Sequence, residues 1–251
     1  MLSDSVVNKI TTPIINQIEQ RVKDIPGWSP LDQLYTLFNL AYLTADMEGD
    51  IVEIGSWCGR SAVVLGMAAQ LAGNTRVHCV DLFPAKDNWR RNADGSYSFL
   101  VEIDGITYGG YQDQTVWAEP FERDILPLYE KNHSLLEIFA QTVAEHQLQD
   151  VVVTHIGDST RFVNSMAETF KCKLAFIDGD HGYKAVCRDI DNVERFLVAG
   201  GWICFDDAFA SYDSVNRAIE ESIINNPVYD MCQQMTRKCF IARKRVTRHS
   251  V

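Results

Sequence analysis

The sequence lacks the features that mark membrane and secreted proteins. Its apolar runs all fall short of the roughly 18 residues that a membrane-spanning helix requires. Its start, MLSDSVVNKI, has neither the basic beginning nor the apolar segment of a secretory signal. None of the seven cysteines forms a C-x-x-C pair of the kind that binds zinc or exchanges disulfides. We therefore expect reduced, structural cysteines in a cytoplasmic protein without membrane contact.

Positive charge is also scarce. Lysine and arginine number 23 against 34 aspartates and glutamates, which gives a net charge of −11. The one basic run is Arg243-Lys244-Arg245, which we expect to be a solvated end after a last strand. A chain with so few cations has little with which to neutralise phosphates. Nucleic acid is therefore a poor partner, and a small-molecule substrate is the expectation.

Short β-branched runs alternate with helical segments along most of the chain. The first two strands flank a helix from about Ser61 to Leu71, a unit that places parallel strands side by side. The last two strands are separated by only three residues and should form an antiparallel hairpin. The pattern predicts a single α/β domain over residues 1–251. The expected strands are Ile51–Ile54, Val77–Val80, Val151–Ile156, Leu174–Ile177, Trp202–Phe205, Val228–Met235 and Cys239–Arg243.

Two segments fall outside this alternation. Residues 1–50 are predicted to form N-terminal helices, one of them opened by Ser29 as N-cap and Pro30 as its first residue. The earliest of these helices offer a contact for a homo-oligomer. Residues 82–133 are too long for an ordinary loop and rich in aromatics, and Asp104-Gly105 within them indicates a two-residue β-hairpin. We expect this insertion to fold over the site as a lid.

The turn after the first strand has an acidic residue followed by two spaced glycines. It reads Glu53-Ile-Gly55-Ser56-Trp57-Cys-Gly59-Arg-Ser61. Its glycines are one residue further apart than in the G-x-G-x-x-G fingerprint of dinucleotides, and a leading carboxylate would repel a pyrophosphate. A cationic ligand such as S-adenosylmethionine suits the turn better than a nicotinamide cofactor does. A glycine-rich turn without any ligand remains an alternative.

Polar residues follow two further strands at the same predicted edge of the sheet. Asp81 ends the second strand, where a carboxylate can accept hydrogen bonds from both hydroxyls of a ribose. Asp158 and Ser159 follow the strand Val151–Ile156 and could bond an adenine amino group. Aspartate is also a common helix cap, so each residue alone is a weak indication. Their common placement makes a nucleoside site the stronger interpretation.

With these residues, the chain from Ile51 to about Asp207 resembles the class I S-adenosylmethionine-dependent methyltransferases, and the glycine turn is similar to that of catechol O-methyltransferase. The resemblance implies a Rossmann-like three-layer α/β/α sandwich whose seven-stranded, mostly parallel sheet has its last strand antiparallel. It implies that the turn from Glu53 to Ser61 holds the methionine part of S-adenosylmethionine. Asp81 would hold the ribose, and Asp158 with Ser159 the adenine. Trp57 would face the sulfonium, consistent with cation–π attraction, unless it belongs to the core.

The second half of the chain places carboxylates after two strands that we expect to be neighbours. Asp178 follows one of them, and Asp206 and Asp207 follow the other. Three hard oxygen ligands of this kind can bind Mg²⁺ together with water and substrate oxygens. The pattern resembles metal-dependent O-methyltransferases, including the macrocin-type and cephalosporin-hydroxylase-like groups. Adjacent acids that only cap the next helix remain an alternative.

His181 lies three residues beyond Asp178, at the position where catechol O-methyltransferase carries a lysine base. A histidine that titrates near neutral pH can take a hydroxyl proton. We therefore expect His181 and Asp178 to be catalytic in methyl transfer to a small-molecule hydroxyl, as in natural-product biosynthesis. A nicotinamide-dependent oxidoreductase on a similar sheet and a non-catalytic cofactor-binding protein are the competing hypotheses.

Overall fold

A seven-stranded sheet forms the centre of the protein in this computed structural model, which describes residues 12–110 and 115–246. The strand order is β6-β2-β1-β7-β8-β10-β9. The β1, β2, β6, β7 and β8 strands pair in parallel, whereas β10 pairs antiparallel with both of its neighbours. The predicted fold class is therefore confirmed. The strands are β1 (Asp50–Ile54), β2 (Val77–Asp81), β6 (Val152–Ile156), β7 (Cys172–Ile177), β8 (Leu197–Phe205), β9 (Tyr229–Gln234) and β10 (Phe240–Lys244).

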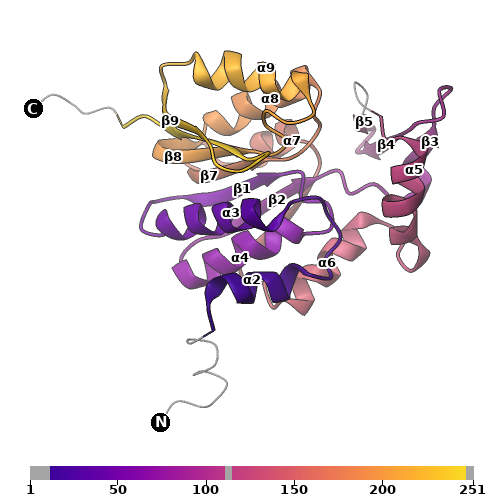
Figure 1. Cartoon of the computed structure of the whole chain (residues 1–251), viewed down its shortest axis with the longest axis horizontal. Helices are drawn as coiled ribbons and strands as arrows, with labels where there is room; N and C mark the ends of the chain where they lie inside the picture. The colour runs from indigo at the N-terminus through magenta and orange to yellow at the C-terminus, as the bar shows by residue number, and fades with distance from the viewer. Residues whose placement is uncertain (1–11, 111–114, 247–251) are drawn as a thin grey trace, which may run out of the picture.

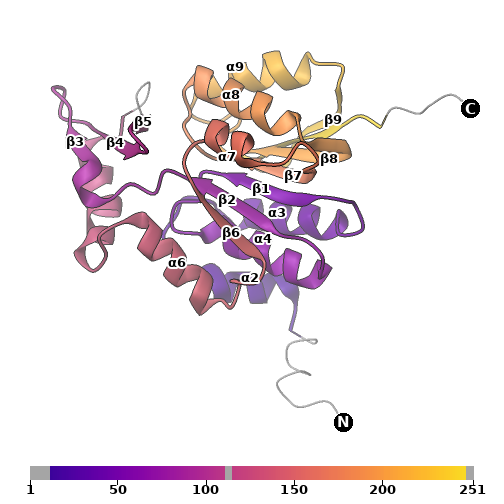
Figure 2. The same ribbon diagram turned by 180° about the vertical axis from the view of Figure 1, so that it is seen from behind.

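Helices cover both faces of this sheet, as Figures 1 and 2 show. Alternate residues of β1 face opposite ways, so that Ile51 joins the apolar cluster on one face and Val52 the cluster on the other. One face packs against α2 (Ile14–Val22), α3 (Leu31–Leu43), α4 (Arg60–Ala72) and α6 (Leu135–Glu145). The other packs against α7 (Ser159–Ser165), α8 (Tyr183–Glu194) and α9 (Asp213–Ile219), which continues as a π turn, Glu220–Ile224.

The strand order reverses at β1, which pairs with β2 on one side and with β7 on the other. In open α/β sheets, ligands bind outside the carboxyl ends of the strands at such a reversal. The turns that follow β1, β2, β6, β7 and β8 therefore form the part of the molecule that can hold a ligand. All of the residues singled out in the sequence lie in or beside these turns.

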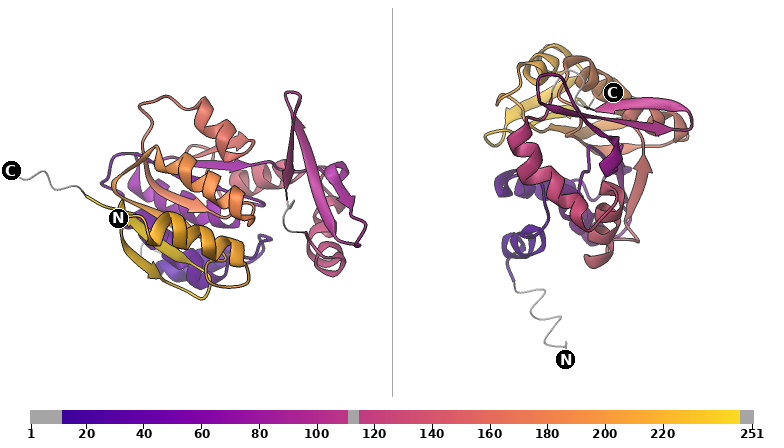
Figure 3. Two further views of the ribbon diagram at one scale, coloured as in Figure 1. Left: turned by 90° about the horizontal axis from the view of Figure 1, so that it is seen from above. Right: turned by 90° about the vertical axis from the view of Figure 1, so that its right-hand side faces the viewer.

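The insertion after β2 builds a second, smaller sheet that stands away from the strand ends (Figure 3). The predicted hairpin at Asp104-Gly105 is confirmed, with φ values of 51° and 75° that are typical of this turn. Stacking of Tyr97 on Phe121 and contacts of Trp89 give the insertion an aromatic core of its own. Its elements are η1 (Lys86–Asn88), β3 (Trp89–Arg91), β4 (Tyr97–Ile103), β5 (Ile106–Gly110), α5 (Ala118–Pro120), η2 (Phe121–Ile125) and η3 (Leu126–Glu130).

Two local predictions differ from the structure. Helix α3 begins at Leu31 with Pro30 as its N-cap, one residue later than predicted, because the Pro30 carbonyl accepts the first helical hydrogen bond, from the Leu34 amide. The basic run is not a solvated end. Arg243 pairs with Asp230 at 2.8 Å, and the Lys244 ammonium donates to two backbone carbonyls. Both residues belong to strand β10.

All seven cysteines are free thiols, five of them buried, as expected for structural cysteines. Among the described residues, no helix is long and apolar enough to cross a membrane. The N-terminal stretch 1–11 and Tyr111 of the insertion lie outside the described residues. The lid and the subunit contact remain predictions.

Candidate active site

The turn between β1 and α4 is closely packed against the end of β7. Gly55 has φ of +91°, and a Cβ atom there would lie 2.0 Å from the Asp178 carbonyl oxygen. Gly59 has φ of +90° and is the N-cap of α4, where a Cβ atom would lie 3.2 Å from the Phe139 ring. Both positions therefore require glycine. The turn that begins at Gly55 is thus in direct contact with the backbone of Asp178.

Glu53 lies behind this turn and not in it. Its side chain is fully buried, and neither carboxyl oxygen makes a hydrogen bond of normal geometry. Burial raises the pKa of Glu53, although the neighbouring Ser56, Ser61 and Cys79 side chains act in the opposite direction. Ser56 and Ser61 are themselves buried. The side chains of these three predicted cofactor residues are therefore buried beneath the turn. A ligand would contact mainly the backbone of the turn.

Asp81 connects the turn to the end of β2. One carboxylate oxygen accepts the Trp57 amide at 2.9 Å and the other accepts the Phe83 amide at 2.6 Å. Trp57 and Phe83 both have positive φ, 47° and 45°, so these bonds hold two strained residues in place. Burial raises the pKa of Asp81, while the amides favour its charged form. Each oxygen keeps a second lone pair with which it can accept a ribose hydroxyl.

Asp158 and Ser159 stand at the start of α7. The Asp158 carboxylate caps the helix by accepting the Arg161 amide at 2.8 Å. Ser159 is fully buried, donates to the Asp189 carboxyl and accepts from Asn192. An adenine contact from Ser159 would therefore have to come from its backbone amide. Asp158 instead borders an open cavity of about 570 Å³ between the β4–β5 hairpin and α7.

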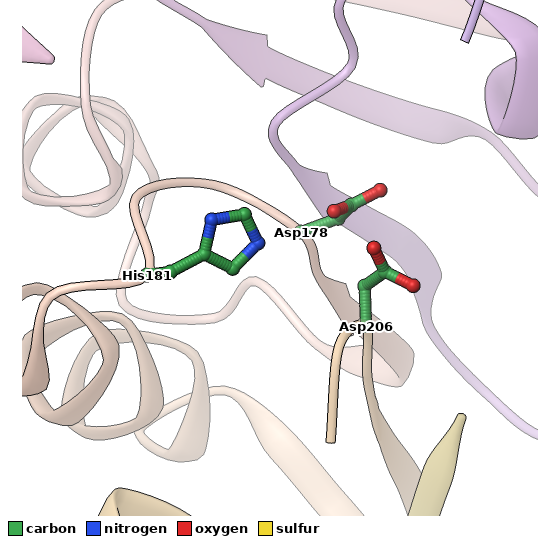
Figure 4. Close-up of side chains that lie close together, drawn as sticks. All are labelled: Asp178, His181 and Asp206. Carbon is green, nitrogen blue, oxygen red and sulfur yellow. The ribbon is translucent and has the colours of Figure 1, made fainter. Parts of the chain in front are cut away.

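The ends of β7 and β8 bring two acids and a histidine together, as Figure 4 shows. Asp178, His181 and Asp206 each have a ligand atom within 4.8 Å of the other two. They line a cavity of about 10 Å³. Asp206 is 5% exposed, and its Oδ1 has no hydrogen-bond partner. The geometry therefore leaves two acidic groups and an imidazole facing one small space.

Asp207, which we predicted to bind metal with Asp178 and Asp206, lies beside this group and not within it. Its backbone has φ of +51°. Its carboxylate pairs instead with the Lys238 ammonium at 3.1 Å, and its other oxygen lies 3.3 Å from His181 Nε2. The structure therefore brings His181, and not Asp207, together with the other two acids.

Lys238 is a residue of this site that we did not single out from the sequence. It lies just before β10, is buried, and also contacts Asp206 Oδ2 at 2.9 Å. The sequence did carry a signal for it. Because β10 runs antiparallel to β8, with Phe240 opposite Phe205, the start of β10 must lie beside the acids that follow β8. A lysine in that turn is then brought to the acids by topology.

Charge and burial shift the pKa values of these groups in opposite directions. Burial first, and then the neighbouring Asp206, raise the pKa of Asp178 well above its usual range. Burial lowers the pKa of His181, against the attraction of Asp207 and Asp206. The acids raise the pKa of Lys238, so that it stays charged. Groups with such opposed shifts are typical of functional sites.

The segment before α3 also reaches the glycine turn. Arg60, which begins α4, donates to the backbone carbonyls of Val22, Ile25 and Ser29 and so fixes this segment. As a result, the Trp28 ring lies 5.6 Å from the Trp57 ring and remains 53% exposed. The Trp28 and Trp57 rings together form an aromatic surface beside the turn. Because the contact joins residues 29 positions apart and of different elements, no local pattern could have revealed it.

Comparison with known proteins agrees with this architecture. A family model described as a methyltransferase domain matches residues 52–208. The O-methyltransferase NovP has a TM-score of 0.58 at 14% identity, over 88% of this chain and 84% of its own. TomG from Streptomyces achromogenes, an O-methyltransferase involved in tomaymycin synthesis and solved with S-adenosylmethionine, has a TM-score of 0.55 at 13% identity, over 97% and 96%. An O-methyltransferase from Bacillus cereus, solved with S-adenosylhomocysteine, has a TM-score of 0.54 at 15% identity, over 96% of each chain.

The likenesses to solved structures concern the fold, whereas the family match concerns the sequence itself. It runs from β1 to the residues that follow β8, and so includes the glycine turn, Asp81 and the acidic cluster. It covers more than half of the chain. The chain therefore belongs to the methyltransferase-domain family, and the S-adenosylmethionine-dependent methyltransferase predicted from its sequence is confirmed.

Proposed function

We propose that this methyltransferase transfers its methyl group to a hydroxyl oxygen of a small molecule. One observation carries the proposal. The backbone of Gly55, in the turn expected to hold the methyl donor, packs directly on the backbone of Asp178, which opens the cluster with His181 and Asp206. A donor in the turn and a hydroxyl at the cluster would then be neighbours, as direct transfer requires.

In the donor site, we assign the methionine part to the turn from Gly55 to Gly59 and the ribose to Asp81. Asp158 borders the space for the adenine. The Trp57 ring lies beside the turn, where its face can attract the sulfonium. Glu53 acts from behind the turn by supporting its backbone.

In the acceptor site, we assign proton transfer to Asp178 and His181. Both groups can exchange a proton, and they lie together in the cluster at the ends of β7 and β8. The hydroxyl proton passes to this pair while the oxygen forms its bond to the methyl carbon. The bond from that carbon to sulfur breaks, and S-adenosylhomocysteine leaves.

The acidic cluster also fits a divalent cation. Asp178 and Asp206 present carboxylate oxygens to a cavity of about 10 Å³, near the minimum of about 10–15 Å³ that holds a water molecule. Asp206 Oδ1 is buried there without a hydrogen-bond partner, which is costly unless a ligand satisfies it. A bound divalent ion would lower the pKa of an acceptor hydroxyl.

The acceptor is proposed to be a small molecule, such as a sugar, glycoside or other natural product. The protein carries a net charge of −11, which disfavours a polyanion. TomG, one of the proteins of similar fold, acts in tomaymycin synthesis. The insertion would then cover the site as a lid.

Two measurements test this function. S-adenosylhomocysteine should raise the melting temperature of the protein, whereas NADH should not, because ligands that bind only the folded state stabilise it. Transfer of a labelled methyl group should then be found with hydroxyl-bearing acceptors and should decrease on treatment with EDTA. A melting temperature raised by NADH alone would instead favour an oxidoreductase.

A further inference from the structure

We propose that His181 binds the divalent ion through Nε2, as the third protein ligand beside Asp178 and Asp206 and in the place expected for Asp207. The inference rests on the proposed function only in requiring that this cluster binds a divalent ion. It does not depend on the identity of the methyl acceptor. It changes the expected site from three carboxylates to two carboxylates and one imidazole.

The positions of the ligand atoms support this assignment. The three residues have ligand atoms within 4.8 Å of one another. In Figure 4 the outer ring nitrogen of His181 points toward the two carboxylates. Asp206 Oδ1 and both His181 nitrogens are buried without a hydrogen bond of normal geometry. Of these atoms, Asp206 Oδ1 and His181 Nε2 face each other across the cluster, an arrangement that a bound ion would satisfy.

The His181 ring is held in this orientation by its neighbours. It stacks on the Tyr212 ring at 4.5 Å between centroids and 7° between planes. Asp207 Oδ2 lies 3.3 Å from Nε2 and attracts the ring toward the acids. A ligand that is fixed before the ion binds loses little freedom on binding. Tyr212 and Asp207 are therefore positioning residues for His181.

Lys238 is a cation that Asp206 and Asp207 share. Its ammonium binds Asp206 Oδ2 at 2.9 Å and Asp207 Oδ1 at 3.1 Å. Asp206 Oδ1 is left without a hydrogen-bond partner. The same charge partly neutralises the acids. Two acids beside an ammonium attract a divalent ion less strongly through charge than three acids would. The affinity of this site for an ion therefore depends more on the chemical type of its ligand atoms.

The donor set predicts which ion is preferred. Imidazole nitrogen is a good ligand for divalent transition metals, whereas Mg²⁺ prefers oxygen and retains water. We therefore expect Mn²⁺ to bind more tightly than Mg²⁺, with His181 responsible for much of the difference. If Nε2 binds the ion, its lone pair is no longer available to a proton. The acceptor proton then falls to Asp178, the other member of the proposed pair.

The test uses the full-length protein stripped with EDTA and loaded with Mn²⁺ alone. Pulsed electron paramagnetic resonance should detect an imidazole ¹⁴N nucleus coupled to the bound Mn²⁺. His181→Phe keeps a ring for Tyr212 to stack on but removes both nitrogens, and His181→Asn serves if the first variant does not fold. The matched control is His133→Phe at an exposed histidine of the loop before α6. Binding of S-adenosylhomocysteine verifies that each variant is folded.

The ¹⁴N signal should be present in the wild type and in His133→Phe but absent from the His181 variants. Calorimetry should show Mn²⁺ affinity reduced about tenfold or more in the His181 variants, with a smaller loss for Mg²⁺. Bound Mn²⁺ without a ¹⁴N signal would overturn the inference, and so would a signal that persists in the His181 variants. No Mn²⁺ binding at all would also reject the divalent ion, while cofactor binding and methyl transfer could still be confirmed.

Discussion

The Asp81 carboxylate orders the glycine turn and is proposed to bind the ribose as well. Its bonds to the Trp57 and Phe83 amides order the glycine turn, and its remaining lone pairs are proposed to hold the ribose. Asp81→Ala should therefore weaken binding of S-adenosylhomocysteine by well over tenfold, since charge-assisted hydrogen bonds contribute about 1.5–3 kcal/mol each. Calorimetry measures the loss. Asp87→Ala, at an exposed acid of the insertion that follows β2, is the control and should bind normally. Equal affinities for wild type and Asp81→Ala would reject the assignment.

Asp189 makes stability depend on pH. It is 3% exposed, and burial raises its pKa to about 7. Because the pKa is raised in the folded state, the folded protein holds this proton more tightly than the unfolded chain does. The contribution of Asp189 to stability is therefore complete below about pH 4 and is lost as the pH rises to about 7. Over this range the loss amounts to about 4 kcal/mol.

Asp189→Asn keeps an oxygen that can accept from Ser159 but cannot ionise. The variant should gain stability relative to the wild type between pH 4 and pH 8, as measured by urea unfolding at each pH. Asp191→Asn, an exposed position of the same helix, should show no such gain. A constant difference between Asp189→Asn and wild type across this range would show that the carboxyl is charged at all of these pH values.

At the scale of elements, the contact between the β1–α4 turn and β7 can be tested with two glycines. Gly55 and Gly73 both have positive φ, but a Cβ atom at Gly55 meets the Asp178 carbonyl oxygen at 2.0 Å, and one at Gly73 meets nothing within 4 Å. Gly73→Ala should cost about 1 kcal/mol, the cost of the left-handed backbone alone. Gly55→Ala should cost about 3 kcal/mol or more. Urea unfolding measures both, and similar losses would show that the turn is not tightly packed on β7.

The turn before β10 is joined to the end of β8 by the buried Lys238. Lys238→Met would leave the Asp206 and Asp207 carboxylates without their shared cation. Removing one partner of a buried ion pair costs about 3–5 kcal/mol. We therefore expect a lower melting temperature, part of which added Mn²⁺ should restore by supplying positive charge. Lys171→Met, which removes an exposed ion pair with Glu48, is the control. An unchanged melting temperature in Lys238→Met would show that the pair contributes little.

The main strands were predictable because most are short apolar runs followed closely by turn residues. Runs such as Ile51–Ile54 and Leu174–Ile177 are buried on both faces and carry a strong local signal. The ends of elements were less predictable. Strand β8 was expected to begin at Trp202 but begins five residues earlier, at Leu197. Local propensity identifies an element, while tertiary contacts decide where it stops.

The candidate site was predictable where side chains follow directly from a strand end, as Asp81, Asp178 and Asp206 do. The site was not predictable where the direction of a side chain decides whether a residue belongs to it. Asp206 and Asp207 are adjacent in sequence and share Lys238, yet only Asp206 lies in the cluster with Asp178 and His181. Ser159 faces α8 and not the strand ends. Such choices depend on contacts between distant segments, which a single sequence does not display.

At the scale of the whole molecule, one sheet brings all parts of the proposed reaction to the same edge. The donor turn follows β1, the ribose carboxylate ends β2, and the acidic cluster follows β7 and β8. Seven of the twelve buried polar atoms that lack a hydrogen-bond partner among the described residues belong to this edge, in Glu53, Ser56, Trp57, His181 and Asp206.

The central claim is that S-adenosylmethionine binds at this edge. Equilibrium dialysis of the pure folded protein against labelled S-adenosylmethionine tests it most directly. We predict one bound molecule per chain, displaced by S-adenosylhomocysteine but not by NADH, and lost in Asp81→Ala. A folded protein that retains neither S-adenosylmethionine nor S-adenosylhomocysteine would contradict the account.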